Sequence, residues 1–322
     1  MPDFIRSVVA QEETITASAV ATYDLPVNPL SFIQYVLRWQ DGAAVGNTAD
    51  PIADALSFIS KLEVLFRGQA IMSMSAADLW FMMTAITGWR PSIMNLVDAA
   101  TERHYLSMII PFSRIPYDPM QAFPASRRGE LQLQVTSTAA VGTVDTPAHI
   151  IETVELVDAM PNSFLKCTTI SKTPSAAGEH DVDLPIGNQI LGAGLFATQV
   201  PTGVVTSRDI GEIRLLIDNI EQKYAKSNWE AFQQEQPMRR GLDFMTNRHT
   251  HAQAANTDVV TGMQLLGIIG AARYAWLEFD PLWDGKYALQ TRGRSRVNFR
   301  INAETTFTAI RVMPVELISP GG

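Results

Sequence analysis

Asp24-Leu25-Pro26-Val27 returns in the middle of the chain as Asp183-Leu184-Pro185-Ile186. A second pair of similar stretches lies upstream, because Met1-Pro2-Asp3-Phe4 opens the chain and Met160-Pro161-Asn162 begins the approach to the second tetrapeptide. An internal repeat of this kind sets the architecture before any single helix or strand is assigned. The two pairs of stretches therefore indicate two copies of one fold in a single polypeptide.

Further positions repeat in the same order along the chain, with gaps between them. The matched groups are Ile59, Leu62, Leu65 and Phe66 with Ile210, Ile213, Leu216 and Ile217; Ser75 and Asp78 with Ser227 and Glu230; Tyr105 with Tyr274; Leu131, Leu133 and Val135 with Val297, Phe299 and Ile301; and Ile151 with Ile310. Copies of about 160 residues are far longer than solenoid repeats and have the size of a complete domain. We therefore expect two tandem domains, residues 1–159 and 160–322.

The composition limits the classes of protein to consider. The chain has 322 residues, of which 46% are hydrophobic, and a formal net charge of −8. A general nucleic-acid binder carries a basic surface against the phosphates, so this acidic chain is not expected to bind nucleic acid specifically. The single cysteine, Cys167, excludes an internal disulfide framework and a cysteine-based zinc site.

Targeting and membrane signals are weak. The first residues lack the basic region and the apolar core of a signal peptide. The most apolar stretch, Gly262 to Trp276, is interrupted by Arg273 and is too short to span a bilayer. We therefore expect a soluble protein that folds in a reducing cytoplasm.

Short apolar runs bounded by turn residues dominate the chain. Two of them alternate strictly between apolar and polar residues, namely Glu130–Val135 and Arg296–Ile301. Other runs typical of strands are Leu30–Trp39, Leu62–Phe66, Ile150–Val157, Phe164–Ile170 and Thr306–Val315. Period-two runs separated by turns predict an all-β sandwich or barrel, and the absence of alternating long helices argues against a parallel α/β sheet.

One helix is predicted at the same place in each repeat. In the first, Ser75 and Asp78 have the spacing of a capping box, Gly88 is suited to end the helix, and Pro91 prevents its resumption. The residues expected on its buried face are Leu79, Met82, Met83 and Ile86.

In the second repeat, Ser227 and Glu230 repeat the cap, and Pro237 is expected to end the helix. The polar stretch Arg239–Asp258 that follows is predicted to be a long surface insertion, and Gly42–Asp54 a smaller loop of the same kind.

Residues with catalytic or metal-binding potential are sparse. His249 and His251 are the only pair with metal-like spacing, because residues two apart in an extended segment point to the same side. No acidic residue follows closely, the first repeat has no matching pair, and exposed loop histidines are the simpler interpretation. No phosphate-binding glycine loop or nucleophile elbow is present, and Cys167 is expected to be a packed strand residue. We therefore expect no catalytic, cofactor-binding or metal site, with His249 and His251 as weak metal candidates only.

Three arginine clusters leave an alternative open. Arg127-Arg128 and Arg239-Arg240 each precede a glycine, and Arg292, Arg294 and Arg296 lie near a strand start. Solvated turns and ion pairs between subunits are the simpler interpretation. The alternative is a basic inner face that contacts nucleic acid or anionic lipid head groups.

Taken together, these residues resemble a double jelly-roll major capsid protein. The resemblance rests on the Asp-Leu-Pro-[Val/Ile] stretch in each half and on the strand–Ser-x-x-acid–helix unit at residues 59–87 and 210–236. It covers nearly the whole chain, and the size is similar to that of the smaller members from lipid-containing bacteriophages. It implies two tandem eight-stranded jelly-roll β-sandwiches, each with a short α-helix in an inter-strand loop.

The resemblance also implies a function. Three chains would form a homotrimer with six jelly rolls, a pseudo-hexagonal capsomer that tiles an icosahedral shell. The implied partners are neighbouring capsomers, minor capsid or penton proteins and the lipids of an internal membrane. The implied localisation is the virion capsid, after synthesis in the host cytoplasm, and no enzymatic activity is expected.

Two other classes remain as alternatives. A bicupin enzyme also has two barrels in one chain, and its metal would use His249 and His251 with a following Glu that is missing here. A carbohydrate-binding β-sandwich would use exposed aromatic platforms. The candidates for such platforms are Trp39, Trp80, Trp89, Trp229, Trp276 and Trp283.

Overall fold

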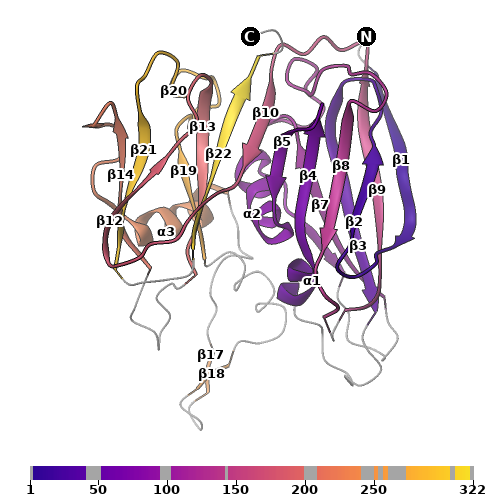
Figure 1. Ribbon diagram of the computed structural model, residues 1–322, viewed down its shortest axis with the longest axis horizontal. Coiled ribbons are helices and arrows are strands. Elements are labelled where there is room, and N and C mark those ends of the chain that lie inside the picture. The colour runs from indigo at the N-terminus through magenta and orange to yellow at the C-terminus, as the bar shows by residue number, and fades with distance from the viewer. Residues whose placement is uncertain are drawn as a thin grey trace. The chain divides into compact units, whose positions relative to one another are not determined.

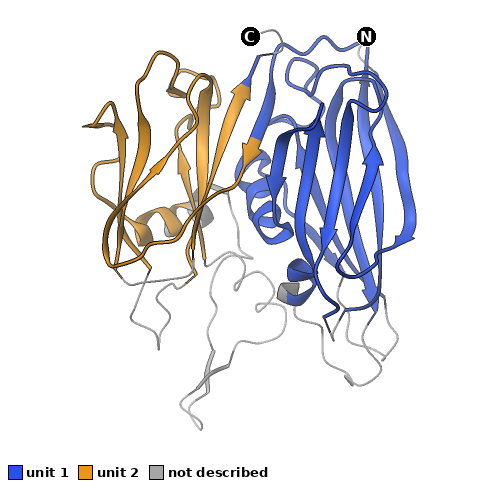
Figure 2. Ribbon diagram, in the orientation of Figure 1, with its two compact units in different colours: residues 1–166, 318–322 blue, residues 167–317 orange. Residues whose placement is uncertain are grey.

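The chain forms two compact units in a computed structural model (Figure 2). The structure describes residues 3–40, 52–94, 103–141, 144–198, 209–240, 250–252, 257–259, 273–304 and 309–319. The first unit comprises residues 1–166 and 318–322, and the second comprises residues 167–317. The repeat boundary expected between residues 159 and 160 lies in the connection from β9 to β10, and it stays a prediction.

The first unit contains two antiparallel sheets (Figure 1). One has the strand order β1-β9-β3-β7-β6, and the other includes the order β5-β4-β8-β2. Their bounds are β1 (Asp3–Thr14), β2 (Val20–Asp24), β3 (Leu30–Gln40), β4 (Ile59–Phe66), β5 (Gln69–Met74), β6 (Ser92–Met94), β7 (Arg103–Pro111), β8 (Leu131–Ser137) and β9 (Asp145–Val157). Apart from the short β6, strands one, three, six and eight along the chain share one sheet, which is the jelly-roll arrangement.

The second unit repeats this arrangement. Its sheets have the orders β11-β22-β13-β19 and β12-β21-β14-β15. Their bounds are β11 (Ile170–Lys172), β12 (Gly178–Asp183), β13 (Gln189–Phe196), β14 (Ile210–Ile217), β15 (Ile220–Glu221), β19 (Tyr274–Glu278), β21 (Val297–Ala303) and β22 (Ile310–Ile318). Short strands accompany them, namely β10 (Phe164–Thr168), β16 (Ser227–Asn228) and β20 (Leu289–Gln290). The prediction of two tandem eight-stranded jelly rolls is confirmed.

The core of each unit lies between its two sheets. In β8, the alternating Leu131, Leu133 and Val135 are buried, as the pattern predicted. In β21, the equivalent Val297 and Phe299 belong to the core of the second unit. The matched groups of the repeat thus fall on corresponding strands of the two units.

In each unit, the repeated tetrapeptide follows the end of one strand and forms a backbone hydrogen bond to the first residue of the neighbouring strand. The amide of Leu25, just after β2, donates a hydrogen bond of 3.0 Å to the carbonyl of Leu131. The amide of Leu184, just after β12, donates one of 2.8 Å to the carbonyl of Val297. Both leucine side chains are buried, so the tetrapeptide closes the core at the same corner of each unit.

In both units, a buried glutamate carboxylate near this corner accepts a hydrogen bond from an asparagine side-chain amide. Asn28 Nδ2 donates to Glu155 Oε2 at 2.7 Å, and Asn188 Nδ2 donates to Glu316 Oε2 at 2.7 Å. Glu155 in β9 and Glu316 in β22 occupy the corresponding last strand of each unit. Ser7 adds a second donor to Glu155 at 2.6 Å. In each unit, the Asn–Glu hydrogen bond holds the segment just after the tetrapeptide against the last strand.

Helix α2 (Ala76–Thr87) confirms the cap predicted in the first repeat. The amide of Asp78 donates to Ser75 Oγ at 3.1 Å, and Gly88 ends the helix with φ of 75°. The expectation of one buried face is wrong, because nearly every side chain from Ala76 to Thr87 is buried. Helix α2 contacts β4, β7 and the unpredicted helix α1 (Ile52–Phe58). The first unit therefore has two helices in its described part, where one was expected.

Helix α3 (Trp229–Arg240) differs from its prediction at both ends. Ser227 does not start it, because the backbone of Ser227 pairs with Ile213 in the sheet. The helix also continues through Pro237 to Arg240, although a proline inside a helix removes a backbone donor and crowds the preceding turn. The buried Trp229 and Phe232 anchor its first turn.

The stretch 239–258, predicted as a surface insertion, contains part of a two-stranded sheet of β17 (Thr250–Ala252) and β18 (Thr257–Val259). The rest of it, apart from the end of α3, and residues 42–51 of the smaller loop lie outside the described residues. The last three residues predicted for the smaller loop, 52–54, instead form the first turn of α1. Among the helices that the structure describes, no segment has the length and apolar character needed to cross a bilayer.

Replacing Ser75 with Ala is expected to destabilise the first unit by about 1 kcal/mol, because an orphan amide of α2 loses its acceptor. Urea denaturation followed by circular dichroism measures the change. Ser227→Ala is the matched control, and it is expected to cost less than half as much because Ser227 lies in β16. An equal loss of unfolding free energy in both variants would indicate that Ser227 also acts as a helix cap.

Asn28→Ala is expected to destabilise the first unit by about 1–3 kcal/mol, because the buried Glu155 carboxylate loses one of its donors. A double-mutant cycle with Glu155→Ala measures the coupling of the pair, and Asn188→Ala with Glu316→Ala repeats it in the second unit. Additive losses in both cycles would contradict a direct contribution of these hydrogen bonds.

Candidate functional site

Four aromatic rings form a continuous cluster on the outer face of the first unit's β1-β9-β3-β7-β6 sheet. Tyr117 packs edge-on against Phe4 at 5.2 Å and against Phe32 at 5.4 Å between ring centroids. Phe32 in turn contacts Trp89 at 5.7 Å. Arg6 on β1 and Gln34 on β3 lie on the same face, and the Arg6 side chain reaches across the intervening strand β9 to Gln34. Trp89 lies in the segment just after α2, and Tyr117 lies in the segment after β7. Two inter-strand segments therefore place their aromatic rings against the same sheet.

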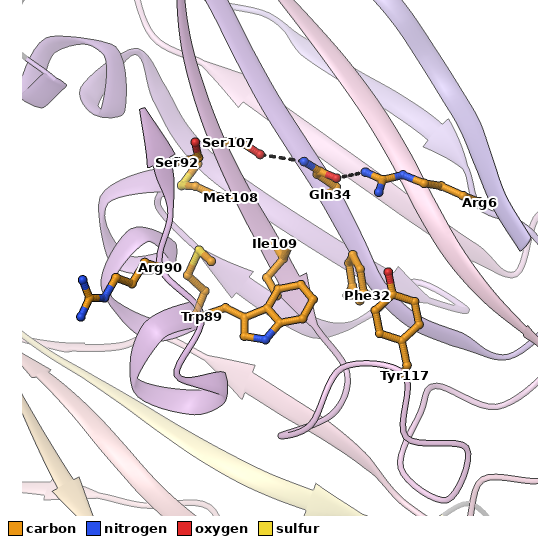
Figure 3. Close-up of a pocket in the computed structure, with 11 residues that line it drawn as sticks. Arg6, Phe32, Gln34, Trp89, Arg90, Ser92, Ser107, Met108, Ile109 and Tyr117 are labelled. Carbon is orange, nitrogen blue, oxygen red and sulfur yellow. Dashed lines mark hydrogen bonds between the residues drawn. The ribbon is translucent and has the colours of Figure 1, made fainter. Parts of the chain in front are cut away.

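A pocket of about 290 Å³ lies beside this cluster (Figure 3). The lining residues are Arg6, Phe32, Gln34, Met83, Trp89, Arg90, Ser92, Ser107, Met108, Ile109 and Tyr117. One wall is aromatic and aliphatic. The other is a polar row that crosses the sheet, in which Arg6 donates to Gln34 and Gln34 donates to Ser107 at 2.8 Å.

The charge of the pocket comes from arginines. Arg6 and Arg90 line it, and none of its described lining residues is acidic. Arg6 also forms an ion pair with Glu152 on β9, outside the lining. The pocket therefore combines an apolar wall, a pre-arranged polar row and cationic groups, which is a combination suited to binding rather than to proton transfer.

The weak metal candidates do not form a described site. His249 lies outside the described residues, and His251 lies in β17 with only its backbone described. In the part of the chain that the structure describes, no group of three or more His, Cys, Asp or Glu side chains is arranged to hold a metal ion. Cys167 is buried, in agreement with the packed role expected for it.

The arginines near the start of β21 are paired with acids. Arg296 binds Asp183 at 2.8 Å, and Arg300 binds Asp181 at 2.8 Å. The hydrogen bond from Arg300 holds the pKa of Asp181 below its ordinary value. Arg294 lies 3.5 Å from Asp218. These ion pairs form within one chain, so they do not test the ion pairs expected between subunits, but they argue against an unpaired basic face at Arg294 and Arg296.

The tryptophans divide into buried and surface residues. Trp39, Trp80, Trp229 and Trp276 are buried, so they do not serve as carbohydrate platforms. Trp89 is exposed, and Trp283 is partly exposed. The sequence analysis named Trp89 among six candidates but did not separate it from the buried ones, because nothing local distinguishes a tryptophan after a helix from one in a core. Its position after Gly88, where the helix ends, was the one available signal.

A buried histidine in the first unit is the main titratable group outside the pocket. His149 in β9 lies between two phenols, with Nε2 2.6 Å from Tyr23 Oη and Nδ1 3.5 Å from Tyr35 Oη. Burial lowers the pKa of His149 to about 4, although the Glu13 carboxylate opposes the shift. Burial, aided by Glu13, raises the pKa of Tyr23 to about 12. The cluster lies between the sheets, so its role is in stability.

The free energy of unfolding is expected to fall as the pH drops from about 6.5 toward 4. The folded state holds His149 neutral, whereas the unfolded state binds a proton there, so acid favours unfolding. The loss is expected to reach about 2 kcal/mol by pH 5. Urea denaturation at pH 7 and pH 5 measures it. His149→Gln is expected to remove most of this pH dependence, whereas His180→Gln, at a surface histidine, is expected to keep it; an unchanged slope in His149→Gln would contradict the assignment.

Solved structures similar to this chain include viral major capsid proteins and virus capsids. The structure of Sulfolobus turreted icosahedral virus matches with a TM-score of 0.68 and 13% identity, covering 99% of this chain and 91% of that chain. The major capsid protein of bacteriophage PM2 matches with a TM-score of 0.61 and 11% identity, covering 99% and 100%. The Faustovirus major capsid protein matches with a TM-score of 0.53 and 9% identity, covering 99% and 90%.

No protein-family model matches the sequence, and no curated protein matches it. The similarity therefore rests on structure, and at such low identity it shows the fold. The strand orders of both units and these matches over almost the full length lead to the same conclusion. The chain has the fold of the double jelly-roll major capsid proteins.

Proposed function

We propose that this protein is a viral major capsid protein with a structural role. The observation that carries the proposal is the pair of consecutive jelly rolls with identical strand orders, matched over 99% of the chain by the structure of a bacteriophage major capsid protein. The shared residues of the two copies are core positions, strand ends and a buried polar pair. Such residues specify a fold, and none of them forms a reactive constellation.

The duplication suits a homotrimeric capsomer. Three chains contain six similar jelly rolls, so a threefold assembly has a nearly hexagonal outline and can tile an icosahedral shell. Closed cyclic symmetry is the usual form of a homo-oligomer, and here it places two related domains in alternation around the axis. The repeat boundary between residues 159 and 160 is part of this proposal.

The proposed partners are neighbouring capsomers and minor capsid or penton proteins, together with the lipids of an internal membrane. The proposed place of action is the virion capsid, after synthesis in the host cytoplasm. The length of this chain is similar to that of the smaller major capsid proteins from lipid-containing bacteriophages. A bicupin enzyme is less well supported, because its metal would depend on His249 and His251 without a third described ligand.

Purified protein is expected to have a mass of three times 35.5 kDa in multi-angle light scattering, and negative-stain microscopy is expected to show hexagonal blocks. The physical reason is the ring of six jelly rolls that a trimer produces. A clean monomer at micromolar concentration would count against the proposal. Hexagonal particles with a different mass would retain the shell role and reject the trimer.

A further inference from the structure

The polar row beside the pocket extends over all five strands of the first unit's β1-β9-β3-β7-β6 sheet. Each strand supplies one polar side chain, namely Ser92 on β6, Ser107 on β7, Gln34 on β3, Glu152 on β9 and Arg6 on β1. Ser92 is the register partner of Ser107, and Glu152 is the register partner of Gln34. Adjacent strands lie about 4.8 Å apart, so the polar row is about 19 Å long.

Hydrogen bonds hold the polar row in place and leave it further bonding capacity. Gln34 Nε2 donates to Ser107 Oγ at 2.8 Å, and Arg6 donates one N–H to Gln34 Oε1 and another to Glu152 Oε2. The guanidinium, the amide and the serine hydroxyl each have a further hydrogen to donate, and the carboxylate has a second oxygen that accepts. A row with both donors and acceptors matches ligand hydroxyl groups, because a hydroxyl donates and accepts at once.

The charges in the polar row are balanced. Arg6 and Glu152 form a direct ion pair, and both side chains are partly exposed, at 46% and 28%. The Glu152 carboxylate beside the guanidinium opposes the approach of a second anion. Arg90 lies across the pocket from Arg6 (Figure 3). The polar row therefore favours an uncharged ligand that carries hydroxyl groups over a small anion.

Two exposed aromatic rings flank the polar row. Trp89 is 42% exposed and Tyr117 is 37% exposed. Both pack against the buried Phe32, and their own ring centroids lie 6.4 Å apart at an angle of 48°. Figure 3 shows these rings along one side of the pocket and the polar row along the other. A sugar ring has an apolar face of C–H groups and a rim of hydroxyl groups, so it fits between two such walls.

The backbone holds both rings in position without a ligand. Gly88 ends α2 in the left-handed region, and the amide of Trp89 donates to Thr87 Oγ1 at 3.0 Å. Tyr117 has φ of 71°, which is unfavourable for a residue with a side chain, and its amide donates to Ser31 Oγ at 2.7 Å. Backbone strain of this kind is concentrated at functional sites. Rings that are already in place lose little conformational freedom on binding.

The size of the pocket suits one sugar ring. Its volume is about 290 Å³. A water molecule takes up about 30 Å³ of liquid volume, so the pocket has room for about ten groups of that size. The polar row continues past the pocket to β1 and β9, so neighbouring sugars of a chain would also find hydrogen-bonding partners.

We propose that the first unit binds an uncharged oligosaccharide on this sheet face. One sugar ring fills the pocket and stacks on Trp89, and the hydroxyl groups of the chain bond to the polar row. Trp89 is thus the tryptophan, among the six considered as carbohydrate platforms, that lies exposed beside a row of hydrogen-bonding groups. This binding goes beyond the structural role proposed above, and it uses residues of the first unit alone.

Isothermal titration calorimetry of the full-length protein tests the inference, with cellotetraose, mannotetraose, galactotetraose and chitotetraose as the probes. At least one probe is expected to bind, with one site per chain. Trp89→Ala is expected to weaken that binding about tenfold, which is the scale of one lost stacking contact. Trp89→Phe keeps a ring and is expected to lose less. Ser107→Ala is expected to weaken binding about fivefold, because one hydrogen bond is lost.

Trp283→Ala is the matched control, because Trp283 is a partly exposed tryptophan of the second unit, and it is expected to leave binding unchanged. Thermal melting shows that each variant is folded, and if Trp89→Ala does not fold, Trp89→Phe and Ser107→Ala decide the matter.

The inference is overturned if no probe binds at millimolar concentration, if Trp89→Ala leaves binding unchanged, or if Trp283→Ala weakens it equally. Benzoate that binds more tightly than every sugar, and loses its binding in Trp89→Ala, would overturn it in favour of a small anion. Each of these outcomes leaves the mass of the wild-type assembly unaffected, so the capsid function is tested separately.

Discussion

Each jelly roll depends on one layer of apolar side chains between its two sheets. Strands that alternate inward and outward residues supply this layer, as β8 and β21 do with every second residue. A layer of this kind tolerates no slip of one residue, since a slip turns every apolar side chain outward. The strand-end bonds of Leu25 and Leu184 and the buried Asn–Glu pairs hold the register in both units.

The two copies share the residues that define the jelly-roll core and differ in some of their connections. Both have the tetrapeptide corner and the buried carboxylate of the last strand. They differ in how the helix begins, since Ser75 caps α2 whereas Ser227 joins a sheet. The copies therefore keep the same strand arrangement while their connections diverge.

This division also explains why no reactive site emerges from the comparison of the halves. The titratable cluster around His149 lies between sheets, and the arginines at β21 are paired with aspartates. The pocket beside Trp89 is lined by aromatic side chains and by Arg6 and Arg90, a combination suited to binding. The structural role proposed above agrees with these features.

The sequence by itself determined the repeat, the all-β class, the strands with strict alternation and the cap at Ser75, because these follow from local periodicity and hydrogen-bonding chemistry. It did not determine that α2 is buried all round, that Pro237 lies inside α3, or that Asn28 and Asn188 bind carboxylates more than 120 residues away. Those outcomes depend on which surfaces meet after the sheets form. Trp89 shows the limit most clearly: its exposure beside Phe32 and Tyr117 depends on three segments far apart in the chain, so only the tertiary structure decided it.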